Sequence, residues 1–174
     1  RLSKISGLTL ILVSFILVVS FISYFFTVAE DQSEVLNSGA NVLSSGAIGI
    51  ENALGPLGAW LANLFINGLF GFSSFFLAGV IFTTGFNLLV QKPVFPNLKL
   101  WVYSTTAILW FSSLFAFLNY LIYPVSTIAW GGALGNYLTG SQGYFTQLMS
   151  PIGTGAVLLF SAAVIITAVY NISF

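Results

Sequence analysis

Carboxylates are the side chains in this sequence that could bind a cation or exchange protons. All of them lie in one segment rich in glycine and serine, and they are Glu30, Asp31, Glu34 and Glu51. Carboxylate oxygens are preferred ligands of Ca²⁺ and Mg²⁺, so a cation site is one interpretation. A solvated acidic linker is the simpler interpretation for a segment of this composition. We therefore expect no catalytic residue and no metal site here.

Other chemistry is limited by the composition. The chain has no cysteine and no histidine, which excludes disulfides, thiolate metal sites and histidine proton relays. The only cations are Arg1, Lys4, Lys92 and Lys99, and the net charge is zero. Nucleic-acid binding depends on clustered positive charge. We expect no direct contact with nucleic acid and no cofactor bound by this segment.

Two glycine motifs mark a repeated plan. The sequence GPLGAWLA (55–62) is matched by GALGNYLT (132–139), and each motif leads into a long apolar run, FGFSSFFLA (70–78) or IGTGAVLLF (152–160). A phosphate-binding loop would need Lys-Ser/Thr and a preceding strand, and both are missing. We interpret each motif as a short helix at the outer surface of the membrane, and the chain as two tandem units of the same plan.

The long apolar runs are typical of membrane spans. Hydrophobic residues make up 57% of the chain and charged residues 5%, whereas soluble domains carry about 25% charged residues. The first run is too long for the signal-peptide core of about 7 to 15 residues, the alternative for that position. We predict an all-α integral membrane protein with four transmembrane helices, at about 5–28, 69–90, 100–123 and 152–172.

The charges predict the topology. Basic residues occur only at the amino terminus and in the turn 91–99, and acids only in the first outer segment. By the positive-inside rule, both termini and this turn lie in the cytoplasm. Segments 29–68 and 124–151 are then outside, so that the spans form two tandem helical hairpins in a single membrane domain, 1–174. We also expect a soluble body to follow Phe174 in a longer protein.

Small residues predict how the helices pack. In lipid, helices associate through close backbone approach rather than through a hydrophobic driving force. The second span has a face of small residues, and the fourth repeats it with one interruption at Phe160. The predicted packing residues are Gly71, Ser74, Ala78 and Gly85, together with Gly153, Ala156, Ala163 and Thr167.

Polar groups within the apolar runs are few. Ion-coupled transporters usually hold ionisable groups at membrane depth, and no predicted span contains one. Asn67, Asn87, Asn119 and the serine and threonine hydroxyls remain, and we interpret them as hydrogen-bonding groups rather than as a substrate site. Trp60 and Tyr137, in the two glycine motifs, are candidate contacts for a partner at the outer surface, although interfacial belt residues are the alternative.

The pattern GPLGAWLANLF…FGFSSFFL, with its second copy GGALGNYL…GTGAVLLF, resembles the amino-terminal four-helix membrane domain of FtsK/SpoIIIE-type DNA translocases. The resemblance covers nearly the whole chain. It implies an ATP-driven motor for double-stranded DNA beyond Phe174, with ATP and Mg²⁺ bound there. It also implies a homo-oligomeric anchor in the bacterial cytoplasmic membrane that recruits cell-division proteins at the septum and serves chromosome partition. None of the family's catalytic residues has a counterpart here.

A stand-alone membrane subunit, either a channel or a small-solute transporter assembled from several copies, is the alternative function. The full reading frame separates the two hypotheses, because a continuation into a GxxxxGK[ST] loop favours the DNA pump.

Overall fold

The computed structural model describes residues 2–43, 49–91, 94–124, 126 and 128–170, and every regular element among them is helical. The long helices are α1 (Leu2–Ser38), α3 (Ser74–Val90), α4 (Asn97–Ile122) and α6 (Tyr144–Tyr170). Shorter elements connect them: η1 (Gly39–Leu43), α2 (Gly55–Ala62), η2 (Asn63–Phe70), η3 (Gly71–Ser73) and α5 (Gly132–Thr139).

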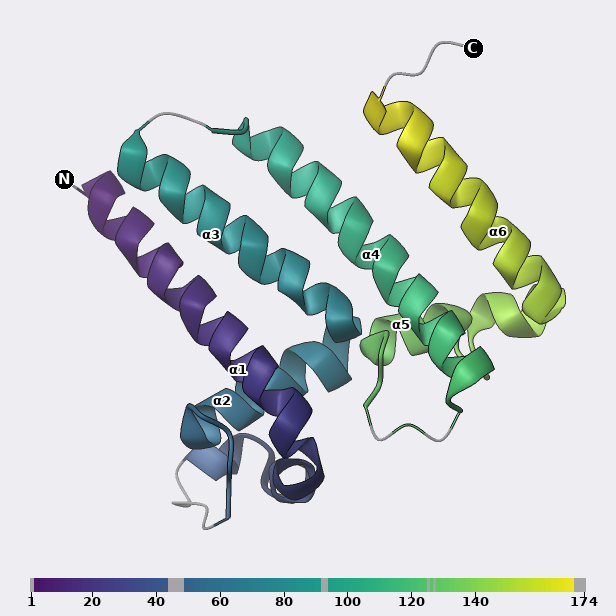
Figure 1. Cartoon of the computed structure of the whole chain (residues 1–174), viewed down its shortest axis with the longest axis horizontal. Helices are drawn as coiled ribbons and strands as arrows, with labels where there is room; N and C mark the ends of the chain where they lie inside the picture. The colour runs from purple at the N-terminus through teal and green to yellow at the C-terminus, as the bar shows by residue number, and fades with distance from the viewer. Residues whose placement is uncertain (1, 44–48, 92–93, 125, 127, 171–174) are drawn as a thin grey trace.

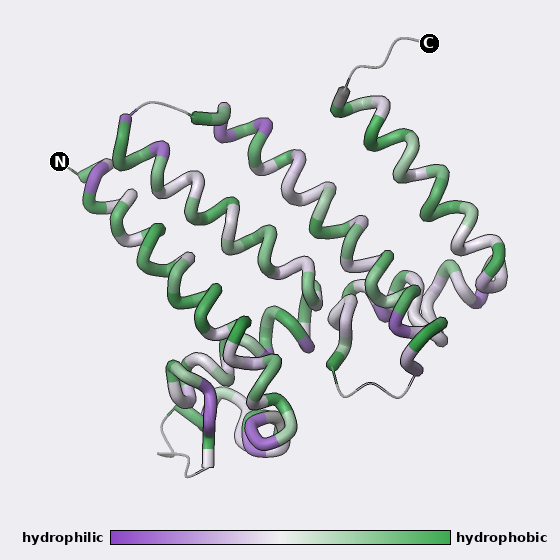
Figure 2. Tube along the Cα trace, viewed as in Figure 1, coloured by the Kyte–Doolittle hydropathy of each residue, from purple (hydrophilic) through white to green (hydrophobic). Residues whose placement is uncertain are grey.

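Four helical stretches are long and apolar enough to cross a membrane, which confirms the predicted fold class. They are Leu2–Asp31, Gly55–Val90, Asn97–Ile122 and Tyr144–Val169. Hydrophobic residues predominate along all four long helices, and hydrophilic residues lie mainly near the helix ends and in the connections (Figure 2). The molecule is therefore a multi-pass membrane protein.

The two ends of the helix array differ in structure. The start of α1, the end of α3, the start of α4 and the end of α6 lie at one end, whereas α2 and α5 lie at the other (Figure 1). If each long helix crosses the membrane once, this arrangement places both chain termini and the short turn between α3 and α4 on the same side. Which end faces the cytoplasm stays a prediction from the charges. Lys92, which contributed to that prediction, lies outside the described residues.

The first helix is longer than predicted, because it continues to Ser38 instead of ending near Val28. The carboxylate of Asp31 holds this extension against the following segment. Its Oδ2 accepts a hydrogen bond from Thr27 Oγ1 at 2.7 Å, and its Oδ1 accepts one from the Glu51 amide at 2.7 Å. Asp31 is 1% exposed, so a solvated linker was the wrong interpretation for this residue.

The second membrane stretch has an internal break. The helix begun by α2 continues as the π-helical η2 (Asn63–Phe70). The break comes at Gly71, with a φ of 65°, and α3 then begins at Ser74 rather than at the predicted Leu69. Glycine adopts this left-handed conformation without the steric cost that a Cβ imposes.

The last helix also contains a break. Ser150 has a φ of 62° and a ψ of 168°, and Pro151 follows it, so α6 consists of a short first part and a longer spanning part. The spanning part begins close to the predicted start at Ile152. The predicted end at Ile172 lies outside the described residues.

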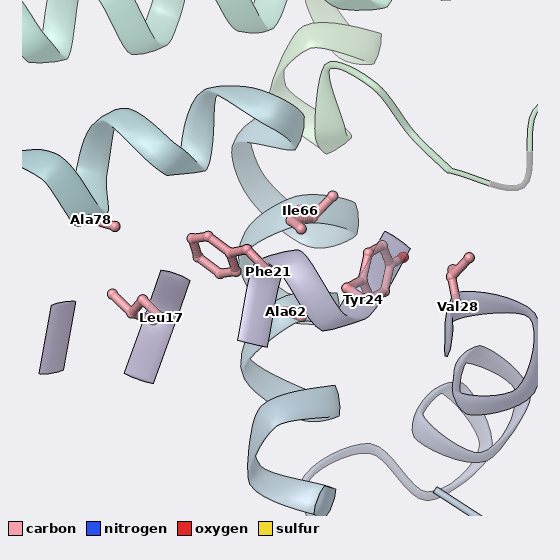
Figure 3. Packing of buried hydrophobic residues seen from close by; sticks show 7 residues of the cluster. All are labelled: Leu17, Phe21, Tyr24, Val28, Ala62, Ile66 and Ala78. Atoms are coloured by element: carbon pink, nitrogen blue, oxygen red, sulfur yellow. The ribbon is translucent and has the colours of Figure 1, made fainter. Parts of the chain in front are cut away.

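A buried apolar cluster packs α1 against α2, η2 and α3. Side chains of Leu17, Phe21, Tyr24 and Val28 face the small Ala62 and Ala78 and the larger Ile66 (Figure 3). The Phe21 ring meets the Phe65 and Phe75 rings edge to face, with centroids 6.0 and 5.4 Å apart. Edge-to-face rings add to the stability gained by packing.

Candidate functional site

A contact between two glycines brings the backbones of α1 and α3 close together. A Cβ atom added to Gly7 would lie 2.7 Å from the Gly85 carbonyl oxygen, and one added to Gly85 would lie 2.8 Å from the Gly7 carbonyl oxygen. Ser14 lies seven residues after Gly7 on α1, and Ala78 lies seven residues before Gly85 on α3. Ser14 Oγ donates a hydrogen bond to the Ala78 carbonyl at 2.8 Å. The seven-residue step indicates antiparallel helices in a regular seam. Sequence reasoning missed Gly7.

A second glycine contact joins the two repeat units. Gly71 and Gly132 both have positive φ, 65° and 64°, and a Cβ added to Gly132 would lie 2.5 Å from the Gly71 nitrogen. The Phe72 amide donates to the Trp130 carbonyl at 2.8 Å, and the two rings stack with centroids 5.9 Å apart. The break before α3 is thus packed against the start of α5.

Ser74 supports the same break from the other side. Its side chain is fully buried, and its Oγ donates to the Phe65 carbonyl at 2.7 Å. The hydroxyl satisfies a carbonyl of the π-helical segment, where the backbone pattern changes. All four predicted packing residues of the second span, Gly71, Ser74, Ala78 and Gly85, are buried.

Small residues also bring α5 onto α4. A Cβ added to Gly131 or to Gly135 would clash with the Ser112 carbonyl and the Ala116 side chain. Ser112 Oγ donates to the Gly131 carbonyl at 2.6 Å, and Thr139 Oγ1 donates to the Ser113 carbonyl at 2.5 Å. The second Gly-x-x-Gly helix is therefore docked on a span by backbone contact.

The predicted packing residues of the fourth span lie differently. Ala156 and Ala163 are exposed, whereas Gly153 and Thr167 are half-buried. Among the described residues, the hydrogen bonds between α4 and α6 come from the Trp110 indole, whose Nε1 donates to Ser161 Oγ at 3.0 Å and to the Leu158 carbonyl at 3.3 Å. A packing role for the fourth-span set stays a prediction.

The three asparagines have different partners. Asn87 is buried and organises the α3–α4 turn: its Nδ2 donates to the Phe95 carbonyl and to Asn97 Oδ1, and its Oδ1 accepts from the Val94 amide. Asn67 Nδ2 donates to Asn63 Oδ1 within η2, and Asn119 Nδ2 donates to the Tyr123 carbonyl. Only Asn87 therefore links two long helices.

The two aromatic candidates lie at the end of the array that carries α2 and α5. Trp60, on α2, is half-buried, and Tyr137, on α5, is 70% exposed. Their short helices start at equivalent glycines, Gly55 and Gly132, which both have positive φ. A role in partner contact stays a prediction for both rings.

Comparison with known proteins adds one assignment. No curated protein and no solved structure matches the chain. A protein-family model described as the 4TM region of DNA translocase FtsK/SpoIIIE matches residues 1–174, the whole sequence. The four helical stretches agree with a four-span region. The chain belongs to the family of four-transmembrane-helix regions of FtsK/SpoIIIE DNA translocases.

Proposed function

We propose that this membrane domain anchors an FtsK/SpoIIIE-type DNA translocase at the division septum of a bacterial cytoplasmic membrane, with both termini in the cytoplasm. The family match over residues 1–174 is the observation that carries the proposal. Translocation of double-stranded DNA, with ATP and Mg²⁺, belongs in this proposal to a motor in the same protein. The membrane domain itself supplies position, self-association and recruitment of cell-division proteins.

The outer end of the array supports the recruiting role. Exposed tyrosines gather around α5 and its flanking segments: Tyr137 is 70% exposed, Tyr123 59% and Tyr144 58%. Aromatic side chains frequently dominate the energetics of protein contacts. Because α5 packs on α4 through backbone contact, this aromatic surface rests on a rigid support.

The spanning part of α6 supports self-association. Ile152, Leu159 and Phe160 are 86%, 76% and 72% exposed, and they flank the exposed Ala156. Large apolar side chains are common at positions that face lipid, but small side chains among them allow a second helix to approach closely. We therefore assign the homo-oligomer contact to the Ala156 and Ala163 face of α6.

A localisation experiment tests the recruiting role. A fluorescent fusion of the chain should concentrate at the septum, and the Trp60→Ala/Tyr137→Ala double variant should insert normally but lose most of that enrichment. The matched control is Trp101→Ala/Tyr103→Ala, which removes two exposed aromatics from α4 near the opposite end. Even distribution of the correctly inserted parent fusion would disprove recruitment.

Self-association has a separate test. Energy transfer between donor-labelled and acceptor-labelled copies in vesicles should fall with Ala163→Leu, because the larger side chain blocks close approach. Ala168→Leu, an equal change at another exposed position of α6, is the control. If energy transfer is the same in both variants, the Ala156 and Ala163 face of α6 is not the contact between copies.

A further inference from the structure

A polar pocket lies where the two repeat units meet at the α5 end of the array. It has a volume of about 350 Å³ and is lined by η2, the last turns of α4, and α5 with the residues after it. Its hydrogen-bonding side chains include Asn67, Asn119, Tyr120, Asn136 and Gln142. The volume falls within the range of roughly 300–1,000 Å³ that is typical of small-molecule sites.

The lining is rich in unused hydrogen-bonding groups. Asn119 and Asn67 each donate from Nδ2 to the protein, and no hydrogen bond among the described residues uses the Oδ1 of either. The side chains of Asn136 and Gln142 and the hydroxyl of Tyr120 likewise make none among the described residues. A carboxamide offers two donors and an acceptor. A ligand with alternating donors and acceptors would fit these groups.

The absence of charge in the lining narrows the class of ligand. None of the lining residues is acidic or basic. A phosphate group favours Arg, Lys or a cluster of backbone amides, and a bare divalent cation favours carboxylates. The ligand that matches this pocket is therefore neutral.

Among neutral ligands, a sugar fits better than a peptide. Each sugar hydroxyl both donates and accepts, as the carboxamides do, and the apolar face of a pyranose ring can lie on the Tyr120 ring. A peptide would also present apolar side chains, but apart from the Tyr120 ring the apolar lining consists of small groups, Ala116, Ala129 and Pro124. We propose that the pocket binds a neutral, hydroxyl-rich sugar unit of one or two rings, independently of the recruiting role.

The test uses the protein in nanodiscs prepared without glycoside detergents. N,N′-Diacetylchitobiose (called chitobiose below), a neutral disaccharide with hydroxyl and amide groups, is the probe, and calorimetric titration with saturation-transfer NMR measures its binding. We expect saturable binding that weakens at least tenfold in Asn136→Ala/Gln142→Ala. Both residues are exposed and their side chains make no internal hydrogen bond among the described residues, so the fold should persist. The control Asn37→Ala, an exposed asparagine on α1, should bind like the parent.

A second arm identifies the source of the sugar. Nanodiscs that contain a monoglucosyl diacylglycerol are compared with plain nanodiscs by thermal unfolding. A stability gain in the glycolipid discs that is lost in Asn136→Ala/Gln142→Ala supports a lipid-borne sugar, whereas chitobiose binding alone supports a free or polymeric glycan. The proposal fails if neither probe binds, if the double variant binds like the parent, or if triglycine binds while both sugars do not.

Discussion

The backbone of Gly7 lies directly against the backbone of Gly85, so α1 and α3 touch where neither helix has a side chain. The contact is reciprocal, because a Cβ on either residue would meet the carbonyl oxygen of the other at less than the separation that carbon and oxygen tolerate. Ser14 and Ala78 continue the seam through a hydrogen bond. Ser3 Oγ also donates to the Leu88 carbonyl at 3.2 Å. Close packing and hydrogen bonds from α1 to α3 therefore hold this helix pair together.

A single methyl group should separate these helices. Gly85→Ala is expected to destabilise the domain by about 1–3 kcal/mol, the usual cost of overpacking a tight interface. Gly79→Ala is the matched control, because a Cβ at Gly79 would meet nothing within 4 Å. Thermal unfolding in nanodiscs measures both variants. Equal midpoints would show that α1 and α3 can shift apart at no cost.

Loss of the Asp31 carboxylate should weaken the attachment of Glu51 to α1. Asp31→Ala leaves the Glu51 amide without its acceptor, and removal of a buried partner costs about 1–3 kcal/mol. Hydrogen exchange at the Glu51 amide should accelerate strongly. Glu30→Ala, at the exposed neighbouring acid, should leave that amide protected. An unchanged exchange rate in Asp31→Ala would mean that other contacts hold the segment.

The Trp110 indole should determine how closely α6 follows α4. Trp110→Phe removes both hydrogen bonds to α6 and is expected to broaden spin-label distances between the two helices. Trp101→Phe makes the same change at an exposed position on α4 that has no such bond among the described residues. If the two variants give the same distance distributions, apolar contacts alone hold α6 in place.

The topology can be measured with introduced cysteines, because the chain has none of its own. Asn37→Cys should react with an impermeant thiol reagent from outside, and Val94→Cys only after the inner side is opened. Both side chains are exposed, and the bond at Val94 uses its backbone amide, which the substitution keeps. The reverse labelling pattern would invert the predicted orientation.

The sequence predicts that there are four membrane-length apolar helices, because each of the four runs is long, apolar and uncharged. It does not predict the extension of α1, since residues 29–38 are polar and the burial of Asp31 depends on Glu51 folding back from the next segment. Gly7 was missed for a similar reason. A single glycine within an apolar run has no periodic signature, and its importance comes from Gly85, which only the fold brings opposite to it.

The polar pocket was equally invisible in the sequence. Asn67 and Asn119 were recognised as polar groups within apolar surroundings, but their spacing says nothing about a shared cavity with Asn136. The three residues come from η2, α4 and α5, and the Gly71–Gly132 contact brings the first and last of these elements together. A site assembled by a contact between repeat units leaves no local motif.

The hydrogen bond from the Phe72 amide to the Trp130 carbonyl makes each hairpin incomplete without the other. The conformation at Gly71 is supported by groups from the second unit, and Gly132 in turn packs against the first. The two hairpins should accordingly behave as complementary fragments. A chain cut between α3 and α4 and expressed as two pieces should reassemble in the membrane, whereas either piece alone should lose the ordered turn that its counterpart completes.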